Sequence, residues 1–211
     1  MAGCCNARGC DRAFTRRFAR RTAKQYRKRG LDRTARAMVS RLGSVEGVSV
    51  LEVGGGVGAI QVELLRRGAA RTTNLELSPA YEQEAAELLA EAGLSGRADR
   101  RILDLATAPD EAEPADVVVL HRVVCCYPDY ARLLGAAAGH ARRQIAFSHP
   151  PRNRVSRAII GAENAWYRLR RSEFRVFTHP PGAMRAVLAE HGFANAVTRG
   201  SGAWQYTTAT R

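Results

Sequence analysis

The chain has 211 residues, of which 45% are hydrophobic and 25% charged, and 33 Lys and Arg against 20 Asp and Glu give a formal net charge of +13. This length buries one full core and is too short for two independent α/β domains. No apolar run approaches the roughly 18 residues that cross a bilayer, and the first 30 residues contain no apolar signal segment. We therefore expect a cytoplasmic protein without a membrane partner. Arg outnumbers Lys 31 to 2, which is typical of a high-GC bacterial genome.

Charge is segregated along the chain. Residues 1–43 hold 13 basic and 2 acidic side chains, residues 44–140 hold 8 basic and 15 acidic, and residues 141–185 hold 10 basic and 2 acidic. An acidic middle region of net charge −7 therefore separates basic segments of +11 and +8. A uniform excess of charge mainly concerns solubility, whereas segregated charge predicts that these regions face different partners.

Two helices are predicted before the first strand. Residues 11–29 contain neither Gly nor Pro, and their aromatic side chains repeat on roughly one helical face, with Asp11 as the candidate cap. Residues 32–42 form the second predicted helix, which Asp32 caps and Gly43 ends.

Strands and helices then alternate. Strands are expected at residues 48–53, 71–77, 100–105, 115–124 and 144–148, and a closing hairpin at 193–199 and 203–210. Helices are expected at residues 59–68, 79–93, 130–138, 153–171 and 180–190. This alternation of buried strands and helices predicts an α/β fold with a doubly wound, parallel sheet. We expect residues 1–43 to form a basic helical lid on a domain of residues 44–211, which carries a second lid insertion near 150–180.

A glycine-rich loop, Gly54-Gly55-Gly56-Val57-Gly58-Ala59, follows the first strand. It fits the dinucleotide fingerprint G-x-G-x-x-A, and it also fits the acidic-x-G-x-G-x-G loop of proteins that bind S-adenosylmethionine. Both loops use glycine to bring the backbone close to a ligand. Glu52 favours the second template, because a carboxylate repels a pyrophosphate and attracts the sulfonium and ammonium groups of S-adenosylmethionine.

Two further acids follow at the ends of the next strands. Glu76 lies 22 residues after Gly54, at the position that bonds ribose hydroxyls in both templates. Asp104 can accept a hydrogen bond from an adenine amino group, while Leu103 or Leu105 covers the ring. Because ligands of open α/β sheets bind at the carboxyl ends of the strands, we expect the three acids to form one site.

These motifs resemble those of the class I S-adenosylmethionine-dependent methyltransferase family. The matching pieces are VLEVGGGVGA, NLELS, ILDLA and ADVVVLHRVVCCYPD, in this order, within about residues 46–210. The resemblance implies a Rossmann-like, mostly parallel seven-stranded sheet with a C-terminal antiparallel hairpin and an N-terminal helical extension. It also implies S-adenosylmethionine as cofactor and S-adenosylhomocysteine as product. The cofactor contacts that it implies are Glu52, Gly54, Gly56, Gly58, Glu76, Leu77, Asp104, Leu105 and His121.

A weaker likeness is to bacterial magnesium-protoporphyrin O-methyltransferases. It rests on the chain length, the Ser148-x-Pro150 segment, the long amphipathic insertion, and Phe177-x-His179 before the last helix.

Methyl transfer is an in-line displacement, and holding the nucleophile roughly 3 Å from the methyl carbon supplies most of the help. His121, Tyr127 and His149 follow strands four and five and are the candidate catalytic bases, although each His also has cofactor contact or packing as an alternative role. The absence of an Asn-Pro-Pro-Tyr tetrad after strand four argues against base-flipping N-methylation. Because no Asp/His cluster has metal-ligand spacing, we predict no metal.

The basic segments point to the acceptor. As lids over the pocket they would place arginines around it, and guanidinium groups bind carboxylates and phosphates bidentately. These arginines are Arg16, Arg17, Arg20, Arg21, Arg152, Arg154 and Arg157. We predict a small anionic or aromatic acceptor, methylated at oxygen. The alternatives are an RNA methyltransferase that uses the basic arms, or a merely solvated Arg-rich surface.

The five cysteines suggest a second alternative. Cys4, Cys5 and Cys10 precede the first helix, and Cys125 and Cys126 follow the fourth strand. If the N-terminal segment folds over the cleft, the five thiols could meet and hold a metal or metalloid in a protein without turnover. No C-x-x-C pair is present, and unconnected thiols in a reducing cytoplasm are the simpler interpretation.

Overall fold

A seven-stranded sheet in the order β3-β2-β1-β4-β5-β7-β6 organises the computed structural model, which describes residues 13–201 and 203–211. Its strands are β1 (Ser49–Val53), β2 (Arg71–Glu76), β3 (Ala98–Ile102), β4 (Ala115–Leu120), β5 (Ala141–His149), β6 (Val197–Ser201) and β7 (Trp204–Thr210). The first five strands pair in parallel, and β7 pairs antiparallel with both β5 and β6. The predicted Rossmann-like sheet with its C-terminal hairpin is confirmed.

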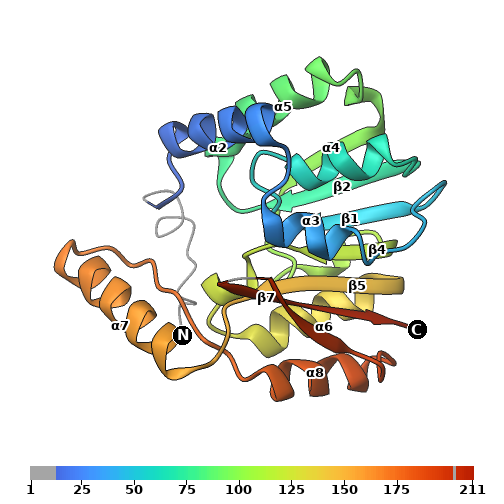
Figure 1. The fold of residues 1–211 in the computed structure, drawn as a ribbon. Helices are drawn as coiled ribbons and strands as arrows, with labels where there is room; N and C mark the ends of the chain where they lie inside the picture. The colour runs from blue at the N-terminus through green and yellow to red at the C-terminus, as the bar shows by residue number, and fades with distance from the viewer. Residues whose placement is uncertain (1–12, 202) are drawn as a thin grey trace.

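Helices cover both sides of this sheet (Figure 1). They are α2 (Arg16–Arg29), α3 (Arg33–Val39), α4 (Ala59–Arg66), α5 (Glu82–Glu91), α6 (Tyr130–His140), α7 (Arg154–Leu169) and α8 (Pro181–Glu190). Short 3₁₀ turns are η1 (Pro79–Tyr81), η2 (Ser95–Arg97), η3 (Pro109–Glu111) and η4 (Val124–Cys126). No helix among the described residues is long and apolar enough to cross a membrane.

Alternate residues of the central strands build two separate cores. Val117 and Val119 of β4 face the core under α2 to α5, whereas Val118 and Leu120 face the core under α6 and α8. Side chains of a strand point alternately to its two faces, so a central strand buried on both sides reads as an unbroken apolar run. Both layers thereby fix the carboxyl ends of the strands, where the predicted site lies.

The N-terminal helices are part of the first core. Ala19, Ala23 and Met38 are fully buried in it. Helix α3 begins after its predicted cap, since Asp32 Oδ1 accepts from the N–H groups of Thr34 and Ala35.

The predicted start of the first helix differs from the structure. Helix α2 begins at Arg16, because the Thr15 side chain accepts from the Phe18 N–H and caps it. Asp11, the expected cap, lies outside the described residues.

Two strands end three or more residues earlier than predicted. Strand β3 ends at Ile102, and Asp104 lies in the following turn, where its Oδ1 accepts from the Ala106 N–H. Strand β4 ends at Leu120, because Arg122 adopts a left-handed φ of 60°. The residues that follow Ile102 and Leu120 therefore lie in turns and not in extended strands.

The edge of the sheet also differs from the prediction. Strand β6 begins at Val197 and not at residue 193, because Phe193 closes the last turn of α8. Its N–H donates to the Leu188 carbonyl, and its ring is fully buried. In contrast, β5 is longer than expected, since it already pairs with β4 at Ala141.

Candidate functional site

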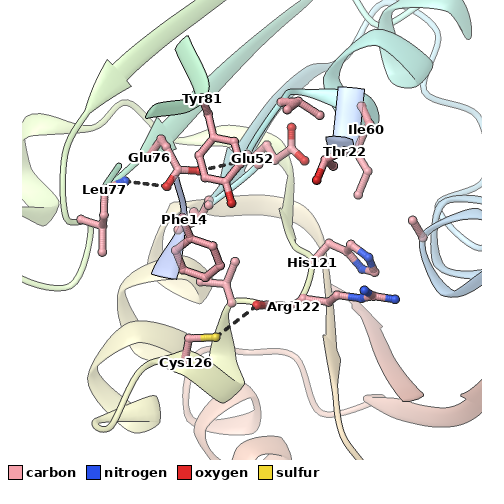
Figure 2. Close-up of a pocket in the computed structure, with 18 of the residues that line it drawn as sticks. Phe14, Thr22, Glu52, Ile60, Glu76, Leu77, Tyr81, His121, Arg122 and Cys126 are labelled. Carbon is pink, nitrogen blue, oxygen red and sulfur yellow. Dashed lines mark hydrogen bonds between the residues drawn. The ribbon is translucent and has the colours of Figure 1, made fainter. Parts of the chain in front are cut away.

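A cavity of about 610 Å³ opens over the carboxyl ends of the central strands, a volume in the range of small-molecule sites. The predicted cofactor contacts and candidate bases that line it are Glu52, Gly54, Gly56, Glu76, Leu77, Asp104, Leu105, His121 and Tyr127. Figure 2 shows Glu52, Glu76 and Tyr81 on one side of this cavity and His121 with Arg122 on another. The structure therefore gathers side chains from β1, β2 and the loops after β3 and β4.

The glycine loop connects β1 to α4 and forms one wall of the cavity. Gly54 has a φ of +66°, and a Cβ there would come within 2.5 Å of Val123 Cγ2. Gly55 packs so closely on the Glu52 carboxylate and the Asn74 amide that a Cβ would overlap both. Its N–H donates to Asn74 Oδ1 over 2.9 Å. A lack of space for a Cβ thus requires glycine at both positions, and the positive φ is a second reason at Gly54.

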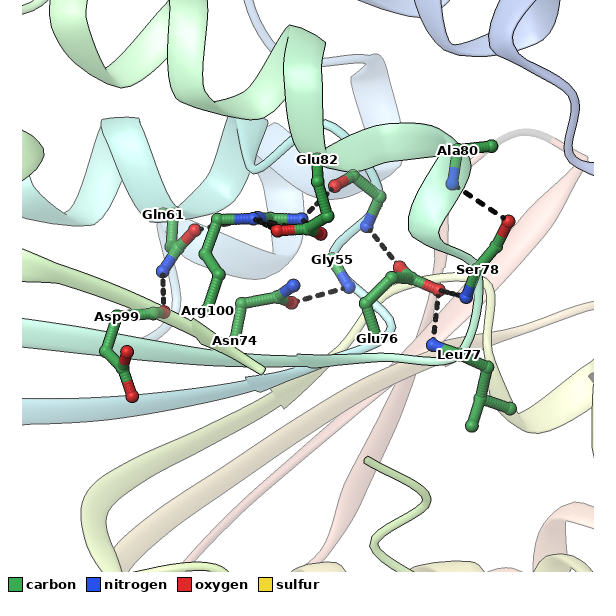
Figure 3. A network of polar contacts seen from close by, with 11 residues as sticks. Gly55, Gln61, Asn74, Glu76, Leu77, Ser78, Ala80, Glu82, Asp99 and Arg100 are labelled. Atoms are coloured by element: carbon green, nitrogen blue, oxygen red, sulfur yellow. Dashed lines mark hydrogen bonds and ion pairs between the residues drawn. The ribbon is translucent and has the colours of Figure 1, made fainter. Parts of the chain in front are cut away.

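A buried guanidinium from β3 holds the same loop from outside. Arg100 donates to the Gly56 carbonyl over 2.7 Å and to Gln61 Oε1 over 3.0 Å, and it pairs with Glu82 at 2.8 Å (Figure 3). Sequence reasoning missed Arg100, because two arginines follow each other in β3. Only the fold shows which one turns toward the loop.

Glu76 is fixed by the backbone around it. Its Oε2 accepts from the Gly56 N–H over 2.8 Å, and its Oε1 accepts from the N–H groups of Leu77 and Ser78 (Figure 3). Burial raises the pKa of Glu76, and these three hydrogen bonds oppose that rise. A carboxylate offers about four lone-pair positions, so one on Oε2 remains for a ligand. The expected bidentate contact with a ribose diol would need one backbone bond to yield.

Glu52 is the least satisfied group in the cavity. It is only 1% exposed, and its Oε2 has no hydrogen-bond partner among the described residues. Burial raises its pKa to about 7, the nearby Glu76 adds to the rise, and Arg100 opposes it. The neighbouring Asn74 Nδ2 likewise lacks a partner within the described part of the chain. An unpaired buried carboxylate is costly, so this corner of the cavity favours a cationic group.

Asp104, the residue expected to accept a hydrogen bond from adenine, contacts Tyr127, one of the candidate bases. The Tyr127 hydroxyl donates to Asp104 Oδ2 over 3.0 Å, which orients the carboxylate. Leu105 is buried behind it, and Leu103 lines the cavity beside it. Tyr127 therefore supports Asp104 in this structure.

His121 has both ring nitrogens engaged. Its Nε2 lies 2.9 Å from Asp32 Oδ2, and its Nδ1 lies 3.0 Å from Ser148 Oγ. An ionised carboxylate only accepts, so Nε2 carries the proton, and in the neutral ring Nδ1 accepts from the Ser148 hydroxyl. Neither the N–H nor the lone pair of the ring is then directed at a substrate.

Asp32 ties the N-terminal helices to this wall. Burial opposes its ionisation, yet the hydrogen bond from His121, the Ala35 N–H and the charge of Arg122 hold its pKa well below the ordinary value. Arg122 pairs with the same Asp32 oxygen at 3.3 Å, and its guanidinium carbon lies 4.8 Å from the centre of the Trp204 ring. Sequence reasoning identified Asp32 only as a cap and did not single out Arg122.

Two predicted site residues lie away from the cavity. His149 is 2% exposed and is bonded to the Pro150 carbonyl and to Thr207 Oγ1, and burial lowers its pKa. Gly58 is the left-handed N-cap of α4. Neither residue lines the cavity, so the geometry assigns both to the framework.

Aromatic side chains form the roof of the cavity. The Phe14 ring centre lies 6.0 Å from that of Tyr81 and 5.3 Å from that of Phe174, and Phe14, Phe18 and Tyr81 line the cavity. The sequence pattern placed Phe14 and Phe18 only on one face of a predicted helix. Their place over the site depends on how α2 docks, for which the sequence offers no local signal.

The predicted arginine lids are only partly at the cavity. Arg21 lines it, whereas Arg20 pairs with Glu84 of α5 at 3.4 Å. Arg154 and Arg157 belong to α7 and do not line the cavity.

Only two of the five cysteines of the metal-binding alternative lie among the described residues. Cys125 and Cys126 lie in η4 with their sulfur atoms 3.7 Å apart, and Cys126 lines the cavity. Cys4, Cys5 and Cys10 lie outside the described residues. Within residues 13–201 and 203–211, no group of three or more His, Cys, Asp or Glu side chains could hold a metal ion.

Comparisons with known proteins agree with this architecture. A family model described as a methyltransferase domain matches residues 14–197, and no curated protein matches the sequence. Among solved structures, magnesium protoporphyrin IX methyltransferase from Synechocystis PCC 6803 with bound S-adenosylhomocysteine has a TM-score of 0.65 and 19% identity, covering 90% of this chain and 82% of its own.

Two other solved structures share the fold at similar identity. An O-methyltransferase family protein from Burkholderia thailandensis has a TM-score of 0.71 and 20% identity, covering 94% of this chain and 63% of its own. A S-adenosylmethionine-dependent methyltransferase described as putative in Methanococcus maripaludis has a TM-score of 0.66 and 18% identity, covering 94% of both chains. At such identities these likenesses concern the fold.

Proposed function

The chain belongs to the methyltransferase domain family, and from that premise we propose that it transfers a methyl group from S-adenosylmethionine to an oxygen of a small anionic or aromatic acceptor. S-adenosylmethionine is the cofactor of this family, and it supplies an electrophilic methyl group on a sulfonium.

The observation that carries the proposal is the unpaired Glu52 oxygen. A buried carboxylate with a raised pKa becomes favourable when a cation neutralises it. The α-ammonium group of the cofactor is such a cation, and the close approach of the Gly54–Gly56 backbone leaves room for the rest of the methionine part. A dinucleotide would instead bring its pyrophosphate against Glu52.

The other acids complete the cofactor site in this proposal. Glu76 accepts from a ribose hydroxyl with its remaining lone pair on Oε2. Asp104, oriented by Tyr127, accepts from the adenine amino group, and Leu103 covers one face of the ring. Leu77 and Leu105 form the apolar floor around it.

The acceptor side is formed by the N-terminal helix and the loop after β4. Arg21 and Arg122 line the cavity there and offer guanidinium groups to an anionic acceptor. Phe14 and Phe18 offer ring faces to an aromatic one. Holding the acceptor oxygen in line is their main contribution.

An acceptor that is already ionised agrees best with the bonding of His121. Because both ring nitrogens are engaged, His121 would have to release Ser148 before it could take a proton. A carboxylate acceptor needs no base. In this mechanism His121 therefore shapes the cavity wall and keeps Arg122 in place through Asp32.

Calorimetry and mass spectrometry test the proposal together. S-adenosylmethionine should bind the wild-type chain while NADH does not, and Glu76→Gln should weaken the binding by about tenfold, the loss of one charge-assisted hydrogen bond. Glu113→Gln, which removes an exposed acid, is the control. Incubation with a set of aromatic carboxylic acids and phenols should give a product heavier by one methylene.

Preferential binding of NADH would refute the cofactor assignment. Binding of S-adenosylmethionine without methylation of any acid or phenol in the set would refute the acceptor class and leave the cofactor site standing.

A further inference from the structure

Helix α7 presents two different faces. On one face, Asn164 donates to the Val176 carbonyl over 2.7 Å and accepts from the Val176 N–H over 2.9 Å. On the same side, the Tyr167 ring packs on Phe174 at 5.2 Å. This inner face holds the helix against residues 172–178, and Figure 1 shows α7 projecting from the side of the molecule.

The opposite face carries a stripe of exposed apolar side chains. Its members, which we call the α7 stripe, are Val155, Ile159, Ala162, Trp166 and Leu169. The exposed fractions are 67% for Val155, 61% for Ile159, 52% for Trp166 and 77% for Leu169. Spacings of four and three residues place all five on one side of the helix. Singly exposed apolar residues are ordinary, but a continuous exposed row marks an interaction surface.

Basic side chains are numerous in and next to α7. The exposed arginines in and next to α7 are Arg152, Arg154, Arg157, Arg168, Arg170 and Arg171. The guanidinium carbon of Arg170 lies 4.2 Å from the centre of the Trp166 ring. Glu163, the acid within α7, accepts from the Tyr167 hydroxyl on the inner side. Helical spacing places Arg154 and Arg170 at the edges of the stripe, and Arg152 and Arg171 lie at the two ends of the helix. Arg157 and Arg168, seven and four residues from Asn164, lie on the Asn164 side instead. The edges and ends of the stripe are therefore positive.

We propose that α7 binds to the surface of an anionic membrane, with the stripe inserted among the headgroups and the arginines on lipid phosphates. A basic helix with Trp and Leu on its apolar face is suited to lie in the plane of such an interface. Its 16 residues extend about 24 Å, too short to span the hydrocarbon core. Juxtaposed basic side chains are attracted to anionic lipids.

The charges distinguish this occupant from others. A second copy of the chain that packed its stripe on this one would bring its own Arg154 and Arg170 close to these two arginines, and like charges disfavour that contact. A nucleic acid would pair with the arginines and leave the apolar row in water. The expectation of no membrane partner was based on the lack of an apolar run that could span a bilayer. A helix that lies on the membrane surface needs no such run, so this proposal departs from that expectation.

The membrane contact does not depend on the proposed methyltransferase function. The α7 helix and the cavity are nevertheless neighbours, because Phe174, which packs on Tyr167 of α7, also contacts Phe14 at the cavity roof. If the proposed function holds, α7 would bring the cavity close to the headgroup region, where amphipathic acceptors gather.

Vesicle binding of the full-length protein tests the proposal. We would use Trp204→Phe as background, because Trp166 is then the single tryptophan. With vesicles of phosphatidylcholine and phosphatidylglycerol, Trp166 emission should shift to the blue and the protein should sediment with the vesicles. Phosphatidylcholine alone should bind at least about tenfold more weakly, and salt should weaken binding to the anionic vesicles.

Matched variants locate the contact. Ile159→Asp should reduce vesicle binding by at least about tenfold, whereas Val197→Asp, which changes an exposed apolar residue of β6, should not. The double variant Arg154→Glu with Arg170→Glu, the two arginines at the edges of the stripe, should also lose binding, and Arg132→Glu with Arg142→Glu, which changes two exposed arginines elsewhere, should retain more of it. Circular dichroism would confirm that each variant is folded.

Three results would overturn the proposal. The first is no binding to anionic vesicles. Binding of an acidic peptide to α7 in place of vesicles would belong to this result. The second is equal binding to neutral vesicles. The third is a dimer in sedimentation that Ile159→Asp dissociates, which would assign the stripe to a second copy.

Discussion

The two walls of the cavity are built in different ways. The wall of Glu52 and Glu76 comes from neighbouring parallel strands, and backbone N–H groups hold it. The wall of His121 and Arg122 depends on Asp32, which is 89 residues away in the chain from His121. The first wall is a local property of the sheet edge, and the second exists only when the N-terminal helices are docked. Changes in the two walls should therefore have separable effects on cofactor and acceptor.

Replacing Glu52 should give the largest effect. In Glu52→Gln the cofactor ammonium would lose its buried partner, so we expect affinity for S-adenosylmethionine to fall by at least about 100-fold, or about 3 kcal/mol. Calorimetry measures this, with Glu113→Gln as the control.

The stability of the unliganded Glu52→Gln variant separates binding from folding. A carboxyl whose pKa is raised from 4.5 to about 7 destabilises the folded state as pH rises between these values. Glu52→Gln should therefore be as stable as wild type at pH 4 and more stable at pH 7.5. A variant that binds normally would refute the role of Glu52.

The pH dependence of cofactor affinity sharpens the same point. Only the ionised form of Glu52 attracts a cation, and with a pKa of about 7 most of it is protonated at pH 5.5. We expect affinity for S-adenosylmethionine to fall on the order of tenfold from pH 7.5 to pH 5.5. Glu52→Gln should show a flat profile, and an equally steep fall in this variant would assign the proton to another group.

The other wall is broken most selectively at Asp32. Asparagine caps helices as well as aspartate, so Asp32→Asn removes the charge toward His121 and Arg122 and keeps α3 capped. We expect kcat/KM for the acceptor to fall about tenfold, the scale of one lost charged contact, with cofactor affinity within about twofold of wild type. Asp129→Asn, the same change at the cap of α6, is the control.

The stability of Asp32→Asn should depend on pH in a defined direction. Because the pKa of Asp32 is held low, its contribution is present above the unfolded-state pKa of about 3.9 and is lost as pH falls below it. The difference from wild type, about 1 kcal/mol at pH 7, should shrink toward pH 3. A cofactor defect equal to the acceptor defect would show that the two walls are not separable.

The same division explains which features the sequence predicts. Glu52, Glu76 and Asp104 were expected at one edge because each lies at the end of a predicted strand. All three line the cavity even though β3 ends before Asp104. The contacts of Asp32, Arg122 and Phe14 arise from helix docking, which leaves no periodic signal in their neighbourhood. Local spacing thus predicts the sheet and one wall, and tertiary packing determines the other.

Tyr127 contacts Asp104 and was also a candidate base, and a substitution can distinguish these two roles. Tyr127→Phe removes the hydrogen bond to Asp104, worth roughly 1 kcal/mol, so we expect cofactor affinity to fall about fivefold and kcat to change little. Tyr167→Phe removes a phenol that bonds Glu163 of α7 and is the control. A loss of kcat by about 100-fold with normal cofactor affinity would instead make Tyr127 a general base.

His149 should have the smallest effect on activity. Its Nδ1–H donates to the Pro150 carbonyl, and its Nε2 accepts from Thr207, so it supports the β5–β7 junction outside the cavity. We expect His149→Gln to keep kcat/KM within about twofold and to lose about 1–2 kcal/mol of stability at pH 8. Burial lowers the pKa of His149, so wild-type stability should decline as pH falls through about 6.5.

Urea unfolding at pH 8 and pH 5.5 measures this decline in stability. The decline should be smaller in His149→Gln. It should be unchanged in the control His191→Gln, which changes a histidine at the end of α8. A 100-fold loss of kcat in His149→Gln with unchanged stability would move His149 from the framework into the catalytic wall. The division between the two walls would then have to include β5, because the base would come from a strand that this structure places behind the cavity.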